Sequence, residues 1–262
     1  MSPFLFVMVM TVLIRDAKQL FIGERGGVLD PSLVVHELLY ADDTLLMDAS
    51  GGSVEQYMRC VEEVGAEFGL TFNFSKLESM PVGCADVVQS PGGGEIPTKS
   101  SMVYLGGLIS NDGKIDSELA RRIGMAKSDF RSLQKVWGHA GLPCKRKLEI
   151  YTACVVNTLL YNLNTTWLSA AARRRINGFH ARCLRQILHI PPACISHVSS
   201  EVVLRMAGAQ PLSEVLLRQQ LSHFGRIAGM PDGAAIRQVV FEPRTLQLKS
   251  AGPRRRGRPR TS

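Results

Sequence analysis

Apolar residues recur at two different spacings along this chain, and the spacing changes near residue 113. Before that point the apolar runs are short and bounded by polar or glycine-rich turns, which is typical of strands. We predict a strand–turn–strand hairpin over residues 34–47 and further strands over 70–74 and 101–109. Residues 54–68 instead have helical spacing and are followed by a glycine, so they predict an amphipathic helix.

From residue 114 onward the spacing is that of helices throughout. Four apolar stripes follow one another over residues 119–137, 148–163, 176–187 and 217–228, and Gly138, Pro143, Pro191, Pro192 and Pro211 interrupt the sequence between some of them. The predicted fold class is therefore α+β, with a partial sheet and helices in residues 1–113 and an all-α bundle in 114–248. Residues 249–262 are rich in Arg, Pro and Gly and predict a disordered basic tail.

The N-terminal apolar segment does not suit a membrane span or a signal peptide. Phe4–Ile14 is a run of 11 uncharged residues, which is too short to cross a bilayer. It has no basic residue before it and no small-residue cleavage pattern after it. Ser2 and Pro3 suit an N-cap and a first helical position, so we expect a buried helix that ends near Arg15–Asp16.

Cysteine usage favours a reducing compartment. The six cysteines are dispersed and form no Cys-x-x-Cys pair, which is typical of free thiols rather than of a disulfide framework. One set, Cys183, His189, Cys194 and His197, has a spacing that matches none of the usual structural zinc sites. We expect an intracellular protein, nuclear or cytoplasmic, that is not secreted and has no membrane partner.

Charge is unevenly distributed between the two halves. Residues 1–113 carry 6 Lys or Arg and 15 Asp or Glu, whereas residues 114–262 carry 25 and 8. A strongly basic half indicates a polyanionic partner, most plausibly nucleic acid, although a basic helix face is also compatible with simple solvation.

The acidic half contains a pair of adjacent carboxylates, Asp42 and Asp43, at the tip of the predicted hairpin. Adjacent aspartates repel each other, and a hard divalent cation such as Mg²⁺, which prefers oxygen ligands, would compensate their charge. Polymerases use such carboxylates to hold two metals about 4 Å apart during phosphoryl transfer. The alternative is an ordinary solvated Asp-Asp turn.

Several short segments occur in the order of the C-terminal part of a reverse transcriptase of the non-LTR (LINE-type) retrotransposon kind. Tyr40-Ala41-Asp42-Asp43 is similar to the catalytic YADD box of that family. The other matching segments are Met1–Phe6 (template- and nucleotide-positioning segment), Asn73–Lys76 (N-x-x-K element), Tyr104–Gly106 (YLG primer grip), and Cys183–Leu188 and Phe224–Asp232 (thumb and connector runs). The resemblance implies a partial polymerase palm in 1–113 and a thumb and connector in 114–248.

The same resemblance implies roles for individual residues. Asp42 and Asp43 would be catalytic ligands of Mg²⁺, and Lys76 would lie near the triphosphate of an incoming deoxynucleotide. Tyr104, Leu105 and Gly106 would support the primer end, with RNA as template and DNA as primer or target. The alternatives are an ordinary surface lysine and a buried strand with a close-packed glycine.

Two groups of arginines are candidates for nucleic-acid contacts. One group is expected on the same helix as the third apolar stripe, on the opposite face, and comprises Arg173, Arg174, Arg175, Arg182 and Arg185. The other lies in the tail and comprises Arg254, Arg255, Arg256, Arg258 and Arg260. The tail sequence resembles an AT-hook, although generic phosphate contacts or a nuclear-import signal suit it equally. A solvated helix face is the alternative for the first group.

The chain also departs from the family pattern. The first catalytic aspartate and the fingers of the family have no counterpart in residues 1–262, so we expect weak or absent Mg²⁺ binding and no polymerase activity from this polypeptide alone. Two alternatives remain open. One is a non-catalytic nucleic-acid-binding module, and the other is a functionless pseudogene product.

Overall fold

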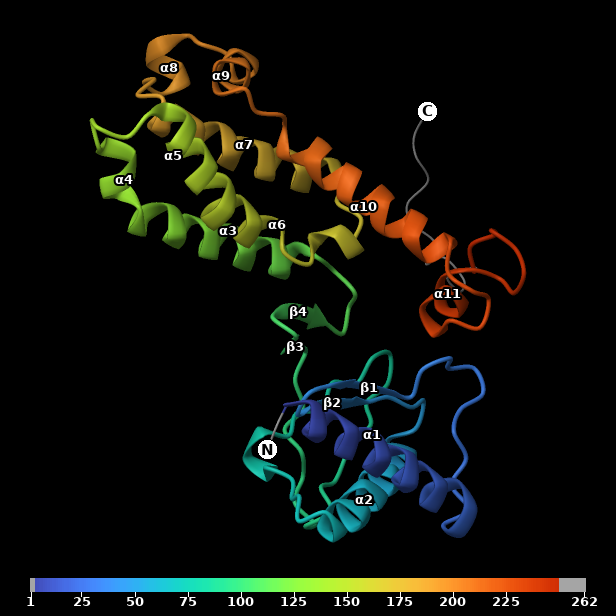
Figure 1. Cartoon of the computed structure of the whole chain (residues 1–262). Helices are drawn as coiled ribbons and strands as arrows, with labels where there is room; N and C mark the ends of the chain where they lie inside the picture. The colour runs from blue at the N-terminus through green and yellow to red at the C-terminus, as the bar shows by residue number, and fades with distance from the viewer. Residues whose placement is uncertain (1–2, 250–262) are drawn as a thin grey trace. The chain divides into compact units, whose positions relative to one another are not determined.

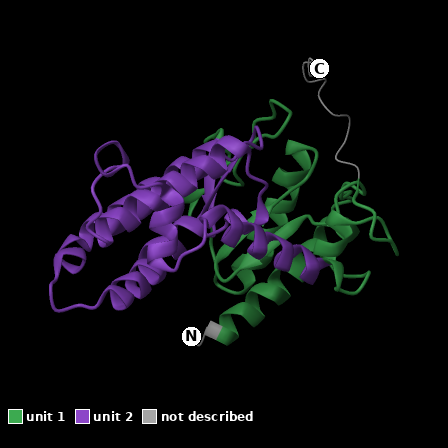
Figure 2. Cartoon of the chain, turned by 90° about the horizontal axis from the view of Figure 1, so that it is seen from above, with its two compact units in different colours: residues 1–100, 228–262 green, residues 101–227 purple. Residues whose placement is uncertain are grey.

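The computed structural model describes residues 3–249. The chain forms two compact units, residues 1–100 with 228–262 (unit 1) and residues 101–227 (unit 2), which are coloured separately in Figure 2. The division falls at Ser100, whereas the sequence pattern places it at 113. Both units combine helices with small antiparallel hairpins, consistent with the predicted α+β class. Within the described residues, no helix is both long and apolar enough to cross a membrane.

Two helices, α1 (Pro3–Gln19) and α2 (Gly51–Glu67), form the core of unit 1 (Figure 1). A π-helical turn, Leu20–Glu24, extends α1. The buried residues come from the second half of α1, from this turn and from α2; they include Leu13, Ile14, Ala17, Phe21, Tyr57, Val61 and Val64. The predicted buried helix is thus correct in type but wrong in extent. It runs past Arg15, and its first half is exposed, with Phe4 84% accessible.

The predicted hairpin is present. Strand β1 (Glu37–Tyr40) pairs antiparallel with β2 (Asp43–Leu46). A salt bridge ties it to α1, because Lys18 Nζ lies 2.8 Å from the Glu37 carboxylate. The helix therefore fixes the strand that leads to the two aspartates.

The helix predicted over 54–68 begins three residues earlier, at Gly51. At its start, the backbone N–H of Gly51 donates to the Asp86 carboxylate at 3.0 Å. Gly69 follows the helix with φ 69°, as expected for a glycine at a helix end. The strand predicted over 70–74 is wrong, since this segment is irregular and leads into a 3₁₀ turn, Phe74–Lys76.

Unit 2 begins with a second hairpin, β3 (Ser101–Tyr104) and β4 (Gly107–Ser110). The sequence analysis predicts one strand here, and the structure divides it into two. Leu105 and Gly106 form the turn and both have positive φ, 47° and 72°. Leucine rarely adopts a positive φ, so an apolar leucine at this position does not indicate a turn in the sequence.

The rest of unit 2 is helical, as predicted. Its helices are α3 (Asp116–Ser132), α4 (Gln134–Gly138), α5 (Cys144–Tyr151), α6 (Asn157–Leu160), α7 (Ala170–Ile187), α8 (Ala193–Ser196), α9 (Ser200–Ala207) and α10 (Leu212–Ala228). A π-helical turn (Thr152–Val156) joins α5 to α6, and a 3₁₀ turn, η4 (Leu163–Thr165), follows α6. The first three apolar stripes contribute to one core that includes Leu119, Phe130, Trp137, Tyr151, Leu159, Ile176 and Leu184.

The fourth predicted stripe does not face the core. Leu217, Leu221 and Phe224 are 36%, 61% and 42% exposed, whereas Leu212 and Leu216 of the same helix are buried. Helix α10 has apolar residues on more than one face, so periodicity alone selects the wrong one.

A short C-terminal segment of unit 1 is organised around Arg237 of α11 (Ala235–Val240). This buried guanidinium donates to the Asp232 carboxylate at 2.9 Å and to the carbonyls of Ala228 and Thr245 at 2.6 and 3.1 Å. A buried charge with this many partners stabilises the local turn.

Candidate functional site

The β1–β2 hairpin presents its aspartates to solvent. Tyr40 pairs with Asp43, so the two turn residues are Ala41 and Asp42, and Asp43 begins the second strand. The prediction that Asp42 and Asp43 are the two turn residues is therefore wrong by one position. Ala41 has φ 55°, and a positive φ at the first turn residue is typical of a type II′ hairpin. Both carboxylates are exposed, and neither makes a hydrogen bond or ion pair with any residue in 3–249.

The base of this hairpin is fixed by polar contacts. The backbone N–H of Met47 donates to the His36 carbonyl at 2.7 Å, which continues the ladder beyond β2. The Asp48 carboxylate lies 3.7 Å from His36 Nδ1 and accepts the backbone N–H of Ser50 at 3.2 Å. The buried carboxylate of Asp48 is therefore partnered, in contrast to those at the tip.

A divalent cation fits this hairpin in part. Mg²⁺ is commonly held by one or two carboxylates, with water and substrate phosphate oxygens completing an octahedron, and Asp42 and Asp43 supply such a pair. Across residues 3–249 no cluster of three His, Cys, Asp or Glu side chains is placed to hold a metal. A two-metal clamp needs a further carboxylate beside such a pair.

Lys76 lies at the end of the 3₁₀ turn, and its side chain is exposed. Ser75 Oγ donates to the Asn73 side chain at 2.6 Å, which stabilises the turn that carries the lysine. The backbone N–H of Lys76 donates to the Asn73 carbonyl at 2.9 Å, whereas its side-chain ammonium has no hydrogen-bond or ion-pair partner among the residues that the structure describes. Its contact with a triphosphate stays a prediction.

Tyr104 is the last residue of β3, and Leu105 and Gly106 form the β3–β4 turn, so the three residues do not lie in one buried strand. Tyr161 Oη donates to the Leu105 carbonyl at 3.0 Å, and Arg121 Nη2 donates to the Gly106 carbonyl at 2.6 Å. The close-packed glycine is Gly107, where an added Cβ would lie 2.4 Å from the side chain of Asn162. The turn is thus held rigidly within unit 2.

Glu118 of α3 anchors the same hairpin from below the turn. Its buried carboxylate accepts the backbone N–H of Leu108 at 3.1 Å and pairs with Arg121 at 2.9 Å and Arg122 at 2.6 Å. Arg122 also donates to the Gly106 carbonyl and lies over the ring of Tyr161. These contacts attach the β3–β4 hairpin to α3. Its role at a primer end stays a prediction.

The arginines of α7 divide into two kinds. Arg174, Arg175 and Arg182 are exposed, as a contact surface requires. Arg185 is buried and donates to the carbonyls of Pro191, at 3.2 Å, and Val198, so the prediction that it lies along a nucleic-acid backbone is wrong. Its charge instead secures the segment after α7.

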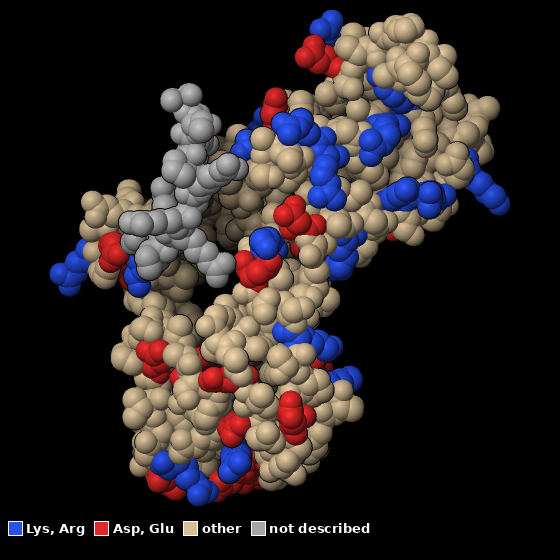
Figure 3. Space-filling model, turned by 180° about the vertical axis from the view of Figure 1, so that it is seen from behind, with Lys and Arg blue, Asp and Glu red and all other residues tan. Residues whose placement is uncertain are grey.

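Arg173 is half-buried; its Nε donates to the Leu168 carbonyl at 3.1 Å, and its guanidinium lies over the ring of Trp167. The tail arginines Arg254, Arg255, Arg256, Arg258 and Arg260 lie outside the described residues. Figure 3 shows Lys and Arg side chains gathered over the helical body on the viewed face.

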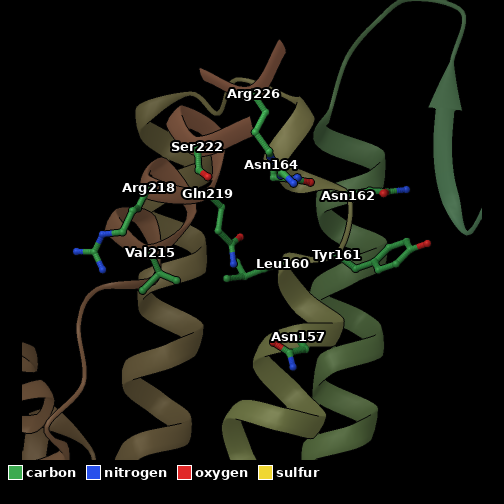
Figure 4. Close-up of a pocket in the computed structure, with 10 residues that line it drawn as sticks. All are labelled: Asn157, Leu160, Tyr161, Asn162, Asn164, Val215, Arg218, Gln219, Ser222 and Arg226. Carbon is green, nitrogen blue, oxygen red and sulfur yellow. The ribbon is translucent and has the colours of Figure 1, made fainter. Parts of the chain in front are cut away.

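A polar groove that the sequence analysis misses lies between α10 and the α6–η4 segment (Figure 4). Its volume is about 630 Å³, and its lining residues are Asn157, Leu160, Tyr161, Asn162, Asn164, Val215, Arg218, Gln219, Ser222 and Arg226. Arg226 extends toward Asn164, and Arg218 projects outward from α10. The guanidinium groups of both arginines lack a hydrogen-bond or ion-pair partner within residues 3–249. The asparagine-rich loop after α6 is the sequence signal that could have indicated the groove.

The interior of unit 2 contains a cluster of titratable groups. Tyr151 Oη and His180 Nδ1 form a buried hydrogen bond of 2.8 Å. Burial lowers the pKa of His180 to about 4, although the backbone of Gln210 acts in the opposite direction. Burial likewise raises the pKa of Cys183 to about 12 and that of Tyr151 above its ordinary value. The histidine is thus held neutral at physiological pH.

A family model matches the part of the chain that contains the β1–β2 hairpin. The sequence model of the family described as "Reverse transcriptase (RNA-dependent DNA polymerase)" matches residues 1–109. This range contains the Tyr40–Asp43 box, Lys76 and the β3–β4 hairpin except its last residue, Ser110. No curated protein matches the chain.

Proposed function

We propose that this chain supplies the later palm and the thumb of an RNA-directed DNA polymerase of the LINE-type retrotransposon kind. The observation that carries the proposal is the Tyr40-Ala41-Asp42-Asp43 box, which lies at an exposed hairpin turn inside the segment that matches reverse transcriptases. Nucleic acid template and deoxynucleoside triphosphates are the ligands that this family implies.

In this proposal unit 1 contributes the metal-binding hairpin. Asp42 and Asp43 would hold Mg²⁺, which as a Lewis acid would supply neutralisation of charge on phosphate oxygens. The Lys18–Glu37 salt bridge and the buried Asp48 keep the hairpin in one position. Lys76 then acts as a point charge toward a triphosphate.

Unit 2 binds the nucleic acid. Residues 101–227 carry 17 Lys or Arg and 7 Asp or Glu, and such an excess favours a polyanion. The β3–β4 turn, fixed by Arg121, Arg122 and Tyr161, provides a rigid edge for a primer end.

A second candidate is a nucleic-acid-binding module without polymerase chemistry. It is favoured by the incomplete carboxylate set across the described residues. The two functions share the basic surface and differ at the hairpin, where the first requires a cation and the second does not.

The hairpin cation is tested by adding Mn²⁺ to the isotopically labelled polypeptide and recording paramagnetic broadening by NMR. We expect the amide signals of residues 40–45 to broaden selectively, and the Asp42→Asn, Asp43→Asn double variant to lose this broadening. Glu67→Gln and Glu95→Gln, which alter exposed carboxylates elsewhere in unit 1, serve as matched controls that keep it.

Uniform, non-selective broadening in wild type would refute the cation site and leave the binding module as the function. A primer-extension assay on an RNA template completes the test. We expect no incorporation by residues 1–262 alone, because the described carboxylates do not complete a two-metal site. Incorporation that Asp42→Ala abolishes would show that the polypeptide is a complete polymerase.

A further inference from the structure

Trp167 is an unusual surface residue. Its side chain is 70% exposed, although a tryptophan is the largest apolar side chain and is normally well buried. The other tryptophan of the chain, Trp137, is 2% exposed and stacks against Phe130 in the core of unit 2. The exposure of Trp167 therefore requires a separate explanation.

The ring of Trp167 is held in place by its neighbours. The guanidinium of Arg173 lies over the ring, 5.1 Å from its centroid, and Arg173 Nε is fixed by the Leu168 carbonyl. The preceding residue is fixed as well, because Gln220 Nε2 of α10 donates to the carbonyl of Thr166. One face of the ring is thus covered by a cation, and the exposed remainder is a rigid aromatic platform.

The chain segment that carries Trp167 also contributes to the groove between α10 and the α6–η4 segment. Asn164 lines this groove three residues before Trp167, and Gln219 lines it next to the residue that anchors Thr166. Arg218 and Arg226 add two positive charges that no described residue neutralises, while the asparagine and glutamine side chains supply amide donors and acceptors.

These features together match single-stranded nucleic acid. Proteins that bind single strands combine aromatic side chains, on which bases stack, with a basic groove that follows the backbone. A paired duplex buries its base faces and offers none to Trp167. A basic surface without an aromatic platform would not distinguish the two forms.

We propose that Trp167 and the α10–η4 groove bind a single-stranded nucleic-acid segment, with one base stacked on Trp167 and its neighbouring phosphates held by Arg218 and Arg226. This inference deepens the proposed nucleic-acid binding of unit 2 and rests on it. It assigns to the groove a preference for single-stranded over duplex nucleic acid, which net charge alone does not provide.

Tryptophan fluorescence tests the stacking directly in the full chain, because the chain has two tryptophans and Trp137 is buried. We expect a thymidine oligonucleotide to quench part of the wild-type emission and a duplex of equal length to quench little. Trp167→Phe should abolish the quenching, since the remaining emission comes from Trp137. Trp167→Ala should weaken single-strand binding by roughly tenfold, as for loss of one stacked base.

The arginines give an independent readout through salt dependence. Arg218→Gln with Arg226→Gln should lower the slope of log K against log salt by about 0.7 per lost phosphate contact on single strands. Arg131→Gln, which removes an exposed arginine of α3, is the matched control and should leave the slope and the quenching as in wild type.

Each failure has a distinct meaning. Binding of the oligonucleotide without quenching would overturn the stacking platform and leave the proposed nucleic-acid binding of unit 2 intact. Equal quenching by single strand and duplex would overturn the strand preference. If the full chain binds neither form at about 50 mM salt, where non-specific electrostatic contacts are strong, both this inference and that part of the proposed function fall.

Discussion

His180 should make unit 2 sensitive to acid. The ring is 4% exposed and its pKa is lowered from 6.5 to about 4, chiefly by burial. Above pH 6.5 the ring is neutral in both folded and unfolded chains and contributes no pH dependence. As the pH falls below 6.5 the unfolded chain binds a proton that the folded chain does not, so the free energy of unfolding decreases until about pH 4.

The size of the effect follows from the two pKa values. At pH 5 the unfolded histidine is almost fully protonated and the folded one is mostly neutral, which costs about 2 kcal/mol of stability relative to pH 8. The groups that surround the ring, Tyr151 and Cys183, have raised pKa values and stay neutral across this range. They therefore do not mask the titration of His180.

Urea denaturation followed by tryptophan fluorescence measures this loss. Both tryptophans, Trp137 and Trp167, belong to unit 2, so the signal reports that unit. His180→Gln retains a group that can hydrogen-bond Tyr151 but does not titrate, and its stability should change between pH 8 and pH 5 by about 2 kcal/mol less than that of wild type. Other histidines cancel in this comparison. Equal pH dependence in the two proteins would refute the buried neutral histidine.

Two further predictions concern unit 2 and the tail. Glu118→Ala should destabilise unit 2 by about 3–5 kcal/mol in the same urea assay, because it leaves the buried charge of Arg122 without its partner. Asp129→Ala on the same helix, whose carboxylate makes no ion pair among the described residues, should cost little. Similar losses of stability in the two variants would argue against a stabilising role of the Glu118–Arg122 ion pair. Deleting residues 249–262, which hold five arginines, should weaken binding to all DNA sequences alike and reduce its salt dependence, whereas a selective loss of A·T-rich binding would indicate an AT-hook.

Short-range patterns predict the β1–β2 hairpin and the helices of unit 2. The hairpin follows from apolar runs on either side of a polar turn, and its pairing keeps the aspartates at the tip. The β3–β4 hairpin is missed because the turn contains Leu105, an apolar residue with a positive φ that only the Tyr161 and Arg121 contacts explain. Such long-range contacts leave no periodic trace in the sequence.

Which face of a helix is buried also depends on distant neighbours. On α10 both Leu216 and Leu217 are apolar, and the structure buries the first and exposes the second. On α7 the charge of Arg185 indicates a surface residue. The carbonyls of residues after the helix accept hydrogen bonds from its guanidinium, however, and these hydrogen bonds permit burial. Sequence periodicity locates these helices, and tertiary hydrogen bonds decide the role of individual side chains.

Charged residues that stabilise this fold form ion pairs with other described residues, whereas those available to ligands do not. The carboxylate of Glu118 is buried and neutralised by two arginines, because an uncompensated charge would be costly there. Asp42 and Asp43 repel each other at a solvent-exposed turn and find no cation among residues 3–249, so they contribute nothing to the fold that a neutral turn would not provide. A divalent cation bound between the two carboxylates would offset their repulsion, and the Mn²⁺ experiment on this hairpin tests that proposal directly.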